Sequence, residues 1–158
     1  MRPRQTRTEQ AVECEEGNLP RNVELKARAR QPEKLEILAR GMATEGPEVL
    51  DQTDTFFSCP RGRLKLRQFG DGSAELIYYE RPDSTGPSTS SYVRAPVESP
   101  DLLHQSLSLA LGVRACVTKH RVVFQVGETR IHLDEVDGLG SFLELEVVLQ
   151  PGQSVDEG

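Results

Sequence analysis

The chain has 158 residues, enough for one domain with a sizeable core. No stretch approaches the roughly 18 consecutive apolar residues of a membrane helix, and the first twenty residues lack the apolar segment of a secretory signal. The net charge of −6 argues against general affinity for nucleic acid. The three cysteines match no zinc or redox spacing, so we expect reduced thiols in a cytoplasmic protein.

Alternation of polar and apolar residues predicts strands along most of the chain. The first predicted strand, 21–30, alternates strictly from Asn22 onward. A helix is predicted over 32–44, since Pro32 suits a first helical turn. Gly70-Asp71-Gly72-Ser73 has the composition of a hairpin turn. The remaining predicted elements are a helix over 99–111 and strands over 49–58, 62–69, 74–81, 91–96, 113–126, 129–136 and 142–149.

Three segments are predicted to lie outside this framework. Residues 1–20 and 151–158 are polar and are expected to be disordered tails, and residues 82–90, rich in Pro, Gly, Ser and Thr, are expected to form a loop. Eight strands in one domain, 21–150, must either split into a sandwich or close into a barrel to protect their edges. We therefore expect a mainly β domain, with two helices on the outside.

The predicted strands carry an excess of positive charge on one face. Alternate residues of a strand share a face. The faces on which basic residues recur, together with Arg81 and Arg94, hold twelve of the 19 Lys and Arg residues and four acids, Glu24, Asp134, Glu144 and Glu146, a net charge of +8. A solvated outer face is the ordinary explanation of such a pattern. Arginine, however, suits bidentate phosphate contacts. The amphipathic helices also need an apolar surface to cover, which would turn the charged face inward.

A charged interior of this kind would bind a polyanion. Like charges repel one another in an empty cavity, and an elongated triphosphate would relieve that repulsion. The acids on the same face would repel phosphate unless a divalent metal joined them to it. Mg²⁺ and Mn²⁺ prefer oxygen ligands and commonly bridge carboxylates to substrate phosphates.

Several motifs, taken in order, resemble those of the CYTH superfamily, the triphosphate tunnel metalloenzymes. Val23–Arg28 is similar to the E-x-E-x-K signature, although Asn22 stands in place of its first Glu. The other matching segments are Arg63–Arg67, Lys119–Arg121, His132–Val136 and Phe142–Glu146. The resemblance implies a closed eight-stranded antiparallel β-barrel tunnel, Mg²⁺ or Mn²⁺, and a small-molecule triphosphate. Class IV adenylate cyclases, thiamine triphosphatases and inorganic triphosphatases are members.

The resemblance and the shared strand faces together give candidate roles to fourteen residues. The expected metal ligands are Glu24, Glu144 and Glu146. Lys26, Lys65 and Asp134 are the expected catalytic residues, with Asp134 holding metal or positioning water. The expected phosphate-binding residues are Lys26, Arg28, Arg63, Lys65, Arg67, Arg81, Arg94, Lys119, Arg121 and Arg130.

Three function classes remain open at this point. The first is a metal-dependent triphosphate enzyme, either a phosphohydrolase or an adenylate cyclase. The second is a non-catalytic polyphosphate- or nucleotide-binding module, because Asn22 lacks the charge of the usual Glu. The third is a barrel for apolar ligands, which the arginine-rich face opposes. The sequence predicts no nucleic-acid or membrane partner and indicates no oligomeric state.

Overall fold

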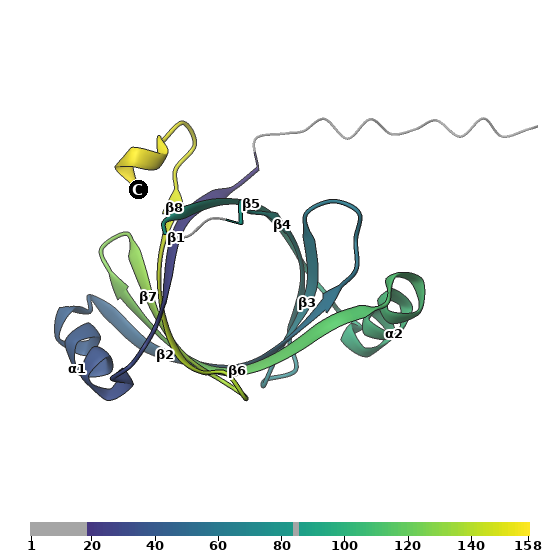
Figure 1. Ribbon diagram of the computed structural model, residues 1–158, viewed down its shortest axis with the longest axis horizontal. Helices are drawn as coiled ribbons and strands as arrows, with labels where there is room; N and C mark the ends of the chain where they lie inside the picture. Colours follow the sequence, from purple (N-terminus) through teal and green to yellow (C-terminus); the bar gives the residue numbers. More distant parts are fainter. Residues whose placement is uncertain (1–18, 84–85) are drawn as a thin grey trace, which may run out of the picture.

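The computed structural model describes residues 19–83 and 86–158, which form a closed barrel of eight antiparallel strands (Figure 1). The strands are β1 (Arg21–Arg28), β2 (Glu45–Phe57), β3 (Arg63–Phe69), β4 (Ala74–Glu80), β5 (Ser88–Pro96), β6 (Val113–Val126), β7 (Thr129–Val136) and β8 (Gly140–Leu149). The order around the barrel is β1-β5-β4-β3-β2-β6-β7-β8, and β8 pairs with β1 to close it. The predicted eight-stranded antiparallel barrel is confirmed.

Two helices lie outside the ring of strands, α1 (Pro32–Met42) and α2 (Pro100–Leu111) (Figure 1). Ala39 of α1 packs on the outward side chains Phe124, Ile131 and Leu133 of β6 and β7. Leu103 and Leu107 of α2 pack on a second cluster around Phe57 and Leu66. The apolar cores thus lie between the sheet and its helices, and this arrangement leaves the inner face of the barrel free for polar side chains.

The ends of the chain and of two strands differ in detail from the prediction. β2 begins at Glu45 and β5 at Ser88, earlier than their alternation indicates. In β5 the added residues pair with β1, Ser88 with Glu24 and Ser90 with Asn22, so the partner strand orders a Ser- and Thr-rich segment. The C-terminal residues form a short 3-10 turn, Val155–Glu157. Of the predicted N-terminal tail, residues 1–18 lie outside the described part.

No helix in the described ranges is long and apolar enough to cross a membrane.

Candidate functional site

The interior of the barrel is a cavity of about 720 Å³. Alternate residues of all eight strands line it, as the strand periodicity requires. Eleven of the fourteen predicted site residues are among them, namely Glu24, Lys26, Lys65, Arg67, Arg81, Arg94, Lys119, Arg121, Arg130, Glu144 and Glu146. The closed sheet therefore brings predicted site residues from six strands, and Arg81 directly after β4, to one space.

The charge of this cavity is smaller than the strand faces predict. Eight basic and six acidic side chains line it, a net charge of +2 with histidine neutral, so the expected interior charge of +8 is wrong. Three of the six acids, Glu45, Glu48 and Asp54, come from β2, where the sequence indicated none. Arg28 and Arg63, which were counted as interior, are not among the lining residues.

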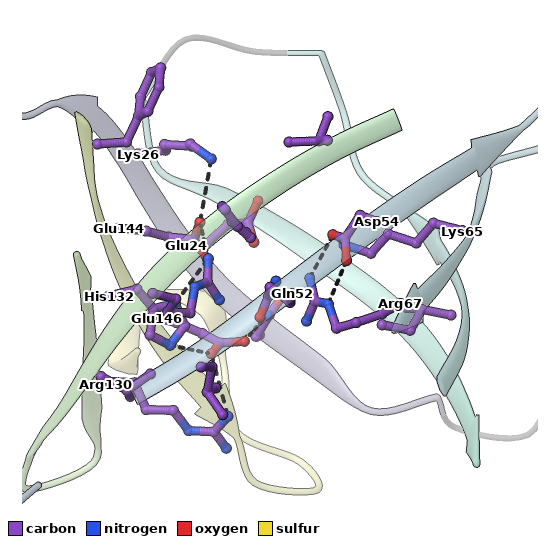
Figure 2. A pocket seen from close by; sticks show the side chains of 18 of the residues that line it. Glu24, Lys26, Gln52, Asp54, Lys65, Arg67, Arg130, His132, Glu144 and Glu146 are labelled. Carbon is purple, nitrogen blue, oxygen red and sulfur yellow. Dashed lines mark hydrogen bonds and ion pairs between the residues drawn. The ribbon is translucent and has the colours of Figure 1, made fainter. Parts of the chain in front are cut away.

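One side of the cavity carries three carboxylates, Glu24, Glu144 and Glu146, which we call the acidic wall (Figure 2). The pairing of β1 with β8 places Glu24 opposite Glu146 and Lys26 opposite Glu144. Glu24 forms an ion pair with Arg81. Lys26 Nζ lies 3.7 Å from Glu144 Oε2. Glu24 and Glu144 therefore each have a basic partner within the cavity lining.

Two further side chains join the carboxylates of β8. His132 Nδ1 lies 3.2 Å from Glu144 Oε1, and His132 Nε2 lies 3.6 Å from Glu146 Oε2. Burial would raise the pKa of Glu144, but the hydrogen bond from His132 and the charge of Arg121 outweigh it and hold that pKa well below its usual range. Arg130 Nη1 lies 3.5 Å from Glu146 Oε2. Basic side chains and His132 thus lie beside the carboxylates of the wall and offset their charge.

Asn22 adds an amide to the acidic wall. Its Nδ2 donates to Glu146 Oε1 at 2.5 Å. This bond fixes the amide orientation and leaves Asn22 Oδ1 buried, with no hydrogen-bond partner in the described part of the chain. A buried polar oxygen of this kind is satisfied by a donor or a cation.

The residue types of the acidic wall fit a divalent cation. Mg²⁺ and Mn²⁺ take carboxylate and amide oxygens, which Glu24, Glu144, Glu146 and Asn22 supply. As arranged, residues 19–83 and 86–158 contain no group of three acidic, His or Cys side chains that could hold a metal ion. The carboxylates would therefore have to exchange their present basic partners for the metal.

The opposite side of the cavity carries the β3 clamp, formed by Asp54, Lys65 and Arg67 (Figure 2). Asp54 accepts from Lys65 Nζ at 2.7 Å and from Arg67 Nε and Nη2 at 2.7 and 2.8 Å. Burial would raise the pKa of Asp54, but the bond from Arg67 and the charge of Lys65 hold it well below its usual range. Burial and the charge of Arg67 lower the pKa of Lys65 to about 8.

An equivalent arrangement, the β6 clamp, consists of Asp134, Lys119 and Arg121. Asp134 accepts from Arg121 Nε and Nη2 at 2.6 and 2.7 Å and from Lys119 Nζ at 3.2 Å. The Asp134 side chain is fully buried and does not line the cavity. Both clamps use a Lys-x-Arg motif on one strand and an aspartate on a neighbouring strand.

Residues 20–158 match the sequence profile of the CYTH domain. The chain belongs to the CYTH family. A protein from Pyrococcus horikoshii is 23% identical, with a TM-score of 0.71 over 87% of this chain and 82% of that one. A candidate adenylate cyclase from Vibrio parahaemolyticus is 22% identical, with a TM-score of 0.67 over 86% of this chain and 80% of that one.

A further structural relative has a described activity. A candidate adenylyl cyclase from Hippeastrum with a dominant triphosphatase activity is 18% identical, with a TM-score of 0.60 over 82% of this chain and 80% of that one. At such identities the likeness shows the shared fold. A comparison with curated proteins gives no match.

Three of the predicted site residues of this CYTH domain do not line the cavity. Arg28 donates to the Leu139 carbonyl at 3.0 Å and Arg63 forms an ion pair with Asp83, both at the ends of their strands. Asp134 lies behind Lys119 and Arg121, with both of its oxygens hydrogen bonded. Strand periodicity gives the correct face for these residues, but it does not give their depth in the tunnel.

Asp54 is one of the cavity residues on β2 that the sequence reasoning missed, with Glu45 and Glu48. It shares a face with Glu48, Gln52 and Phe56 of β2, and this alternation could have indicated it. The adjacent Phe57 obscures the pattern, because one phenylalanine turns inward and the other packs outside in the α2 core.

Proposed function

We propose that this CYTH triphosphate tunnel domain is a divalent-metal-dependent enzyme that acts on a nucleoside, thiamine or inorganic triphosphate. The observation that supports it best is the placement of two aspartate-held Lys-x-Arg clamps and a three-carboxylate wall around one cavity. Basic forks suit phosphate oxygens, and carboxylates suit a metal that neutralises phosphate. A metal-bound triphosphate also matches a cavity whose net charge is only modestly positive.

In this proposal the acidic wall holds the metal and the clamps hold the phosphates. Glu24, Glu144 and Glu146, with the oxygen of Asn22, are the metal ligands. Bound there, Mg²⁺ or Mn²⁺ would polarise a phosphoryl oxygen and offset the charge that develops on it. The residues that bind phosphate inside the tunnel are Lys26, Lys65, Arg67, Arg81, Arg94, Lys119, Arg121 and Arg130, with Arg28 and Arg63 at the strand ends.

The remaining work is positioning and electrostatic stabilisation. Guanidinium groups that are held in place before the substrate arrives do not have to reorganise during phosphoryl transfer. Lys26 and Lys65 are the proposed catalytic residues, because both face the cavity. Lys65 can exchange a proton near neutral pH, since its pKa is lowered to about 8. Asp134 positions Lys119 and Arg121.

Phosphohydrolase and adenylate cyclase are both compatible with this arrangement. A hydrolase needs a placed water, and a cyclase needs a pocket for the base. Tyr79 and Tyr92 line the cavity and could stack on a planar group, whereas the Tyr78 hydroxyl donates to Glu80 at 2.5 Å and does not line the cavity. A cytoplasmic location and a lack of nucleic-acid partners remain predictions.

The second candidate is a module that binds a triphosphate without turning it over. The hydrogen bond from Asn22 to Glu146 favours it, because it places a neutral amide where the signature has a carboxylate. One missing charge weakens the binding of a divalent cation.

A substrate panel tests the proposal. The protein is incubated with Mg²⁺ or Mn²⁺ and with ATP, thiamine triphosphate or inorganic triphosphate, and phosphate, pyrophosphate and cyclic nucleotide are measured. We expect metal-dependent turnover of at least one substrate, lost in Glu146→Gln and kept in Glu45→Gln, a cavity acid on β2 outside the wall. Binding without turnover across the panel would favour the module. If Glu146→Gln turned over substrate as fast as wild type, the assignment of Glu146 as a metal ligand would be wrong.

A further inference from the structure

Asp54 is a buried acid of the cavity that has no part in the metal site proposed above. Its residue is 3% exposed, and both of its oxygens accept from the β3 clamp. A buried carboxylate with such short contacts to two cations costs free energy to desolvate, which only its partners repay. Its position is therefore tied to theirs.

The relation of Asp54 to its partners is the same as that of Asp134. In each clamp the aspartate binds the arginine through Nε and Nη2, in the geometry of a planar fork against a carboxylate. The lysine amine bonds to the same carboxylate. A carboxylate gripped in this way fixes the direction of the guanidinium, so that its remaining N–H groups keep one orientation.

Lys65 has a second dependence on Asp54, which concerns its charge. The groups that face it are Asp54 from β2, Arg67 on its own strand, Lys119 from β6 and the ring of Tyr79 from β4, 5.6 Å from Nζ. Burial and the charge of Arg67 lower the pKa of Lys65, and Lys119 adds to this, whereas Asp54 raises it. Asp54 is therefore the acid on which the charge of Lys65 depends.

We infer that Asp54 is a positioning residue that keeps Lys65 charged and aligned with Arg67, and that it thereby sets the alkaline limit of triphosphate binding in the tunnel. This inference rests on the proposed function in so far as the anion is a triphosphate. Without Asp54, two adjacent cations would share a buried site with no counter-charge. Lys65 would then release its proton at lower pH, and the tunnel would lose one phosphate contact under mildly alkaline conditions.

The test measures Lys65 and the binding of inorganic triphosphate separately. The chain has four lysines, so the ¹³Cε signals of labelled lysine can be followed across a pH titration and assigned with Lys65→Arg. We expect the Lys65 signal to titrate near pH 8 and to move down by about one pH unit in Asp54→Asn, a tenfold change in acidity. The affinity for inorganic triphosphate with Mg²⁺, measured by calorimetry, should fall above the Lys65 midpoint of each protein, wild type and Asp54→Asn.

Matched variants separate this effect from loss of structure. Asp51→Asn removes an acid of the same strand that is exposed and pairs with His120, and should change neither midpoint. Asp54→Glu should restore much of the wild-type profile. In Lys65→Arg the side chain keeps its charge at every pH used, so triphosphate binding should no longer weaken at alkaline pH. This result does not depend on whether Asp54→Asn folds.

Each outcome decides a different part. An unchanged Lys65 midpoint in Asp54→Asn would overturn the inference. If the Lys65 midpoint shifts but the pH dependence of triphosphate binding does not, Asp54 does not set the alkaline limit of binding. The same conclusion follows if binding to Lys65→Arg still weakens at alkaline pH. If the wild-type protein binds no triphosphate, the proposed function fails, and the lysine titration still decides whether Asp54 controls Lys65.

Discussion

The two sides of the tunnel hold their charges in different ways. The β3 and β6 clamps are closed by short contacts of 2.6 to 2.8 Å to buried aspartates from Arg67 and Arg121, whose side chains are 15% and 8% exposed. On the acidic wall, Lys26 and Arg130 lie 3.7 and 3.5 Å from their carboxylates and have side chains 43% and 41% exposed. The clamps are therefore preformed, whereas part of the wall is neutralised by side chains that can leave.

Because of this difference, we expect the clamps to contribute to stability and the acidic wall to exchange its partners for a ligand. Exposed ion pairs contribute little, and breaking them leaves groups that water can solvate. A buried ion pair contributes little net stability, because its attraction is offset by the cost of desolvating both charges. Removal of one partner, however, leaves the other charge unpaired in the interior and destabilises the fold. A metal can thus displace the partners of the wall at modest cost, while the phosphate-binding forks keep their direction.

The largest expected effect comes from breaking the β6 clamp. Asp134→Asn leaves Lys119 and Arg121 without their full counter-charge, and their side chains are 9% and 8% exposed. The free energy of unfolding should fall by about 3–5 kcal/mol. Urea denaturation at neutral pH measures it, with Asp51→Asn as the surface control. A loss no greater than that of the control would mean that the clamp is not a buried ion cluster.

Replacement of a carboxylate of the acidic wall by its amide should lower metal affinity and leave the free energy of unfolding nearly unchanged. Glu24→Gln removes a proposed metal ligand, and its partner Arg81 can turn to solvent because its side chain is 32% exposed. We expect a loss of about 100-fold in metal affinity, since even indirect supports of a metal site cost 10–100-fold. Titration with Mn²⁺ followed by electron paramagnetic resonance measures this directly.

A matched variant tests whether the loss belongs to the wall. Glu48→Gln removes a cavity acid on β2 and should keep its Mn²⁺ affinity. Equal losses in Glu24→Gln and Glu48→Gln would show that the total charge of the cavity, rather than the wall, governs the metal.

Acid should remove the stability that three hydrogen-bonded carboxylates of the barrel provide, two in the clamps and one on the wall. The pKa values of Asp54, Asp134 and Glu144 are lowered in the folded state. As pH falls below about 4, the unfolded chain takes up protons first, so this stability, present at neutral pH, is lost as pH approaches the folded pKa values. Each carboxyl adds a slope of about 1.4 kcal/mol per pH unit. Urea midpoints between pH 7 and pH 3 should show a shallower loss in Asp134→Asn than in wild type.

How far the sequence predicts each side depends on the depth of its residues. Alternation in 21–30, 129–136 and 142–149 indicates which residues of the wall share a face, because each strand is apolar on the other side. β2 has phenylalanines on both faces, so Asp54 gave no comparable signal. The pairing of β2 with β3, which places Asp54 opposite Arg67, identifies the aspartate half of the β3 clamp more directly than the alternation of β2 does.

Depth along a strand is likewise a property of the closed barrel. Arg63, Lys65 and Arg67 alternate identically, yet only the last two line the cavity, while Arg63 reaches Asp83 in the segment after β4. Asp134 shares its face with Arg130 and His132, but the two clamp cations lie over it. Which residues cover which is decided by the tilt and register of neighbouring strands, which a single strand does not encode.

The smallest expected effect concerns Asn22, where the wall departs from the family signature. Asn22→Glu replaces an amide by a fourth carboxylate. The nitrogen of that amide donates to Glu146, and its buried oxygen has no partner among residues 19–83 and 86–158. We expect Mn²⁺ affinity to rise by about tenfold, because added ligand charge tightens hard-cation sites. In metal-free protein the same change should lower stability, since like charges face each other there. Asn22→Gln, neutral but longer, is the control, and a rise in affinity in both variants would point to side-chain reach rather than charge. No rise in Asn22→Glu would mean that this position is not a ligand, and that the metal depends on Glu24, Glu144 and Glu146 alone.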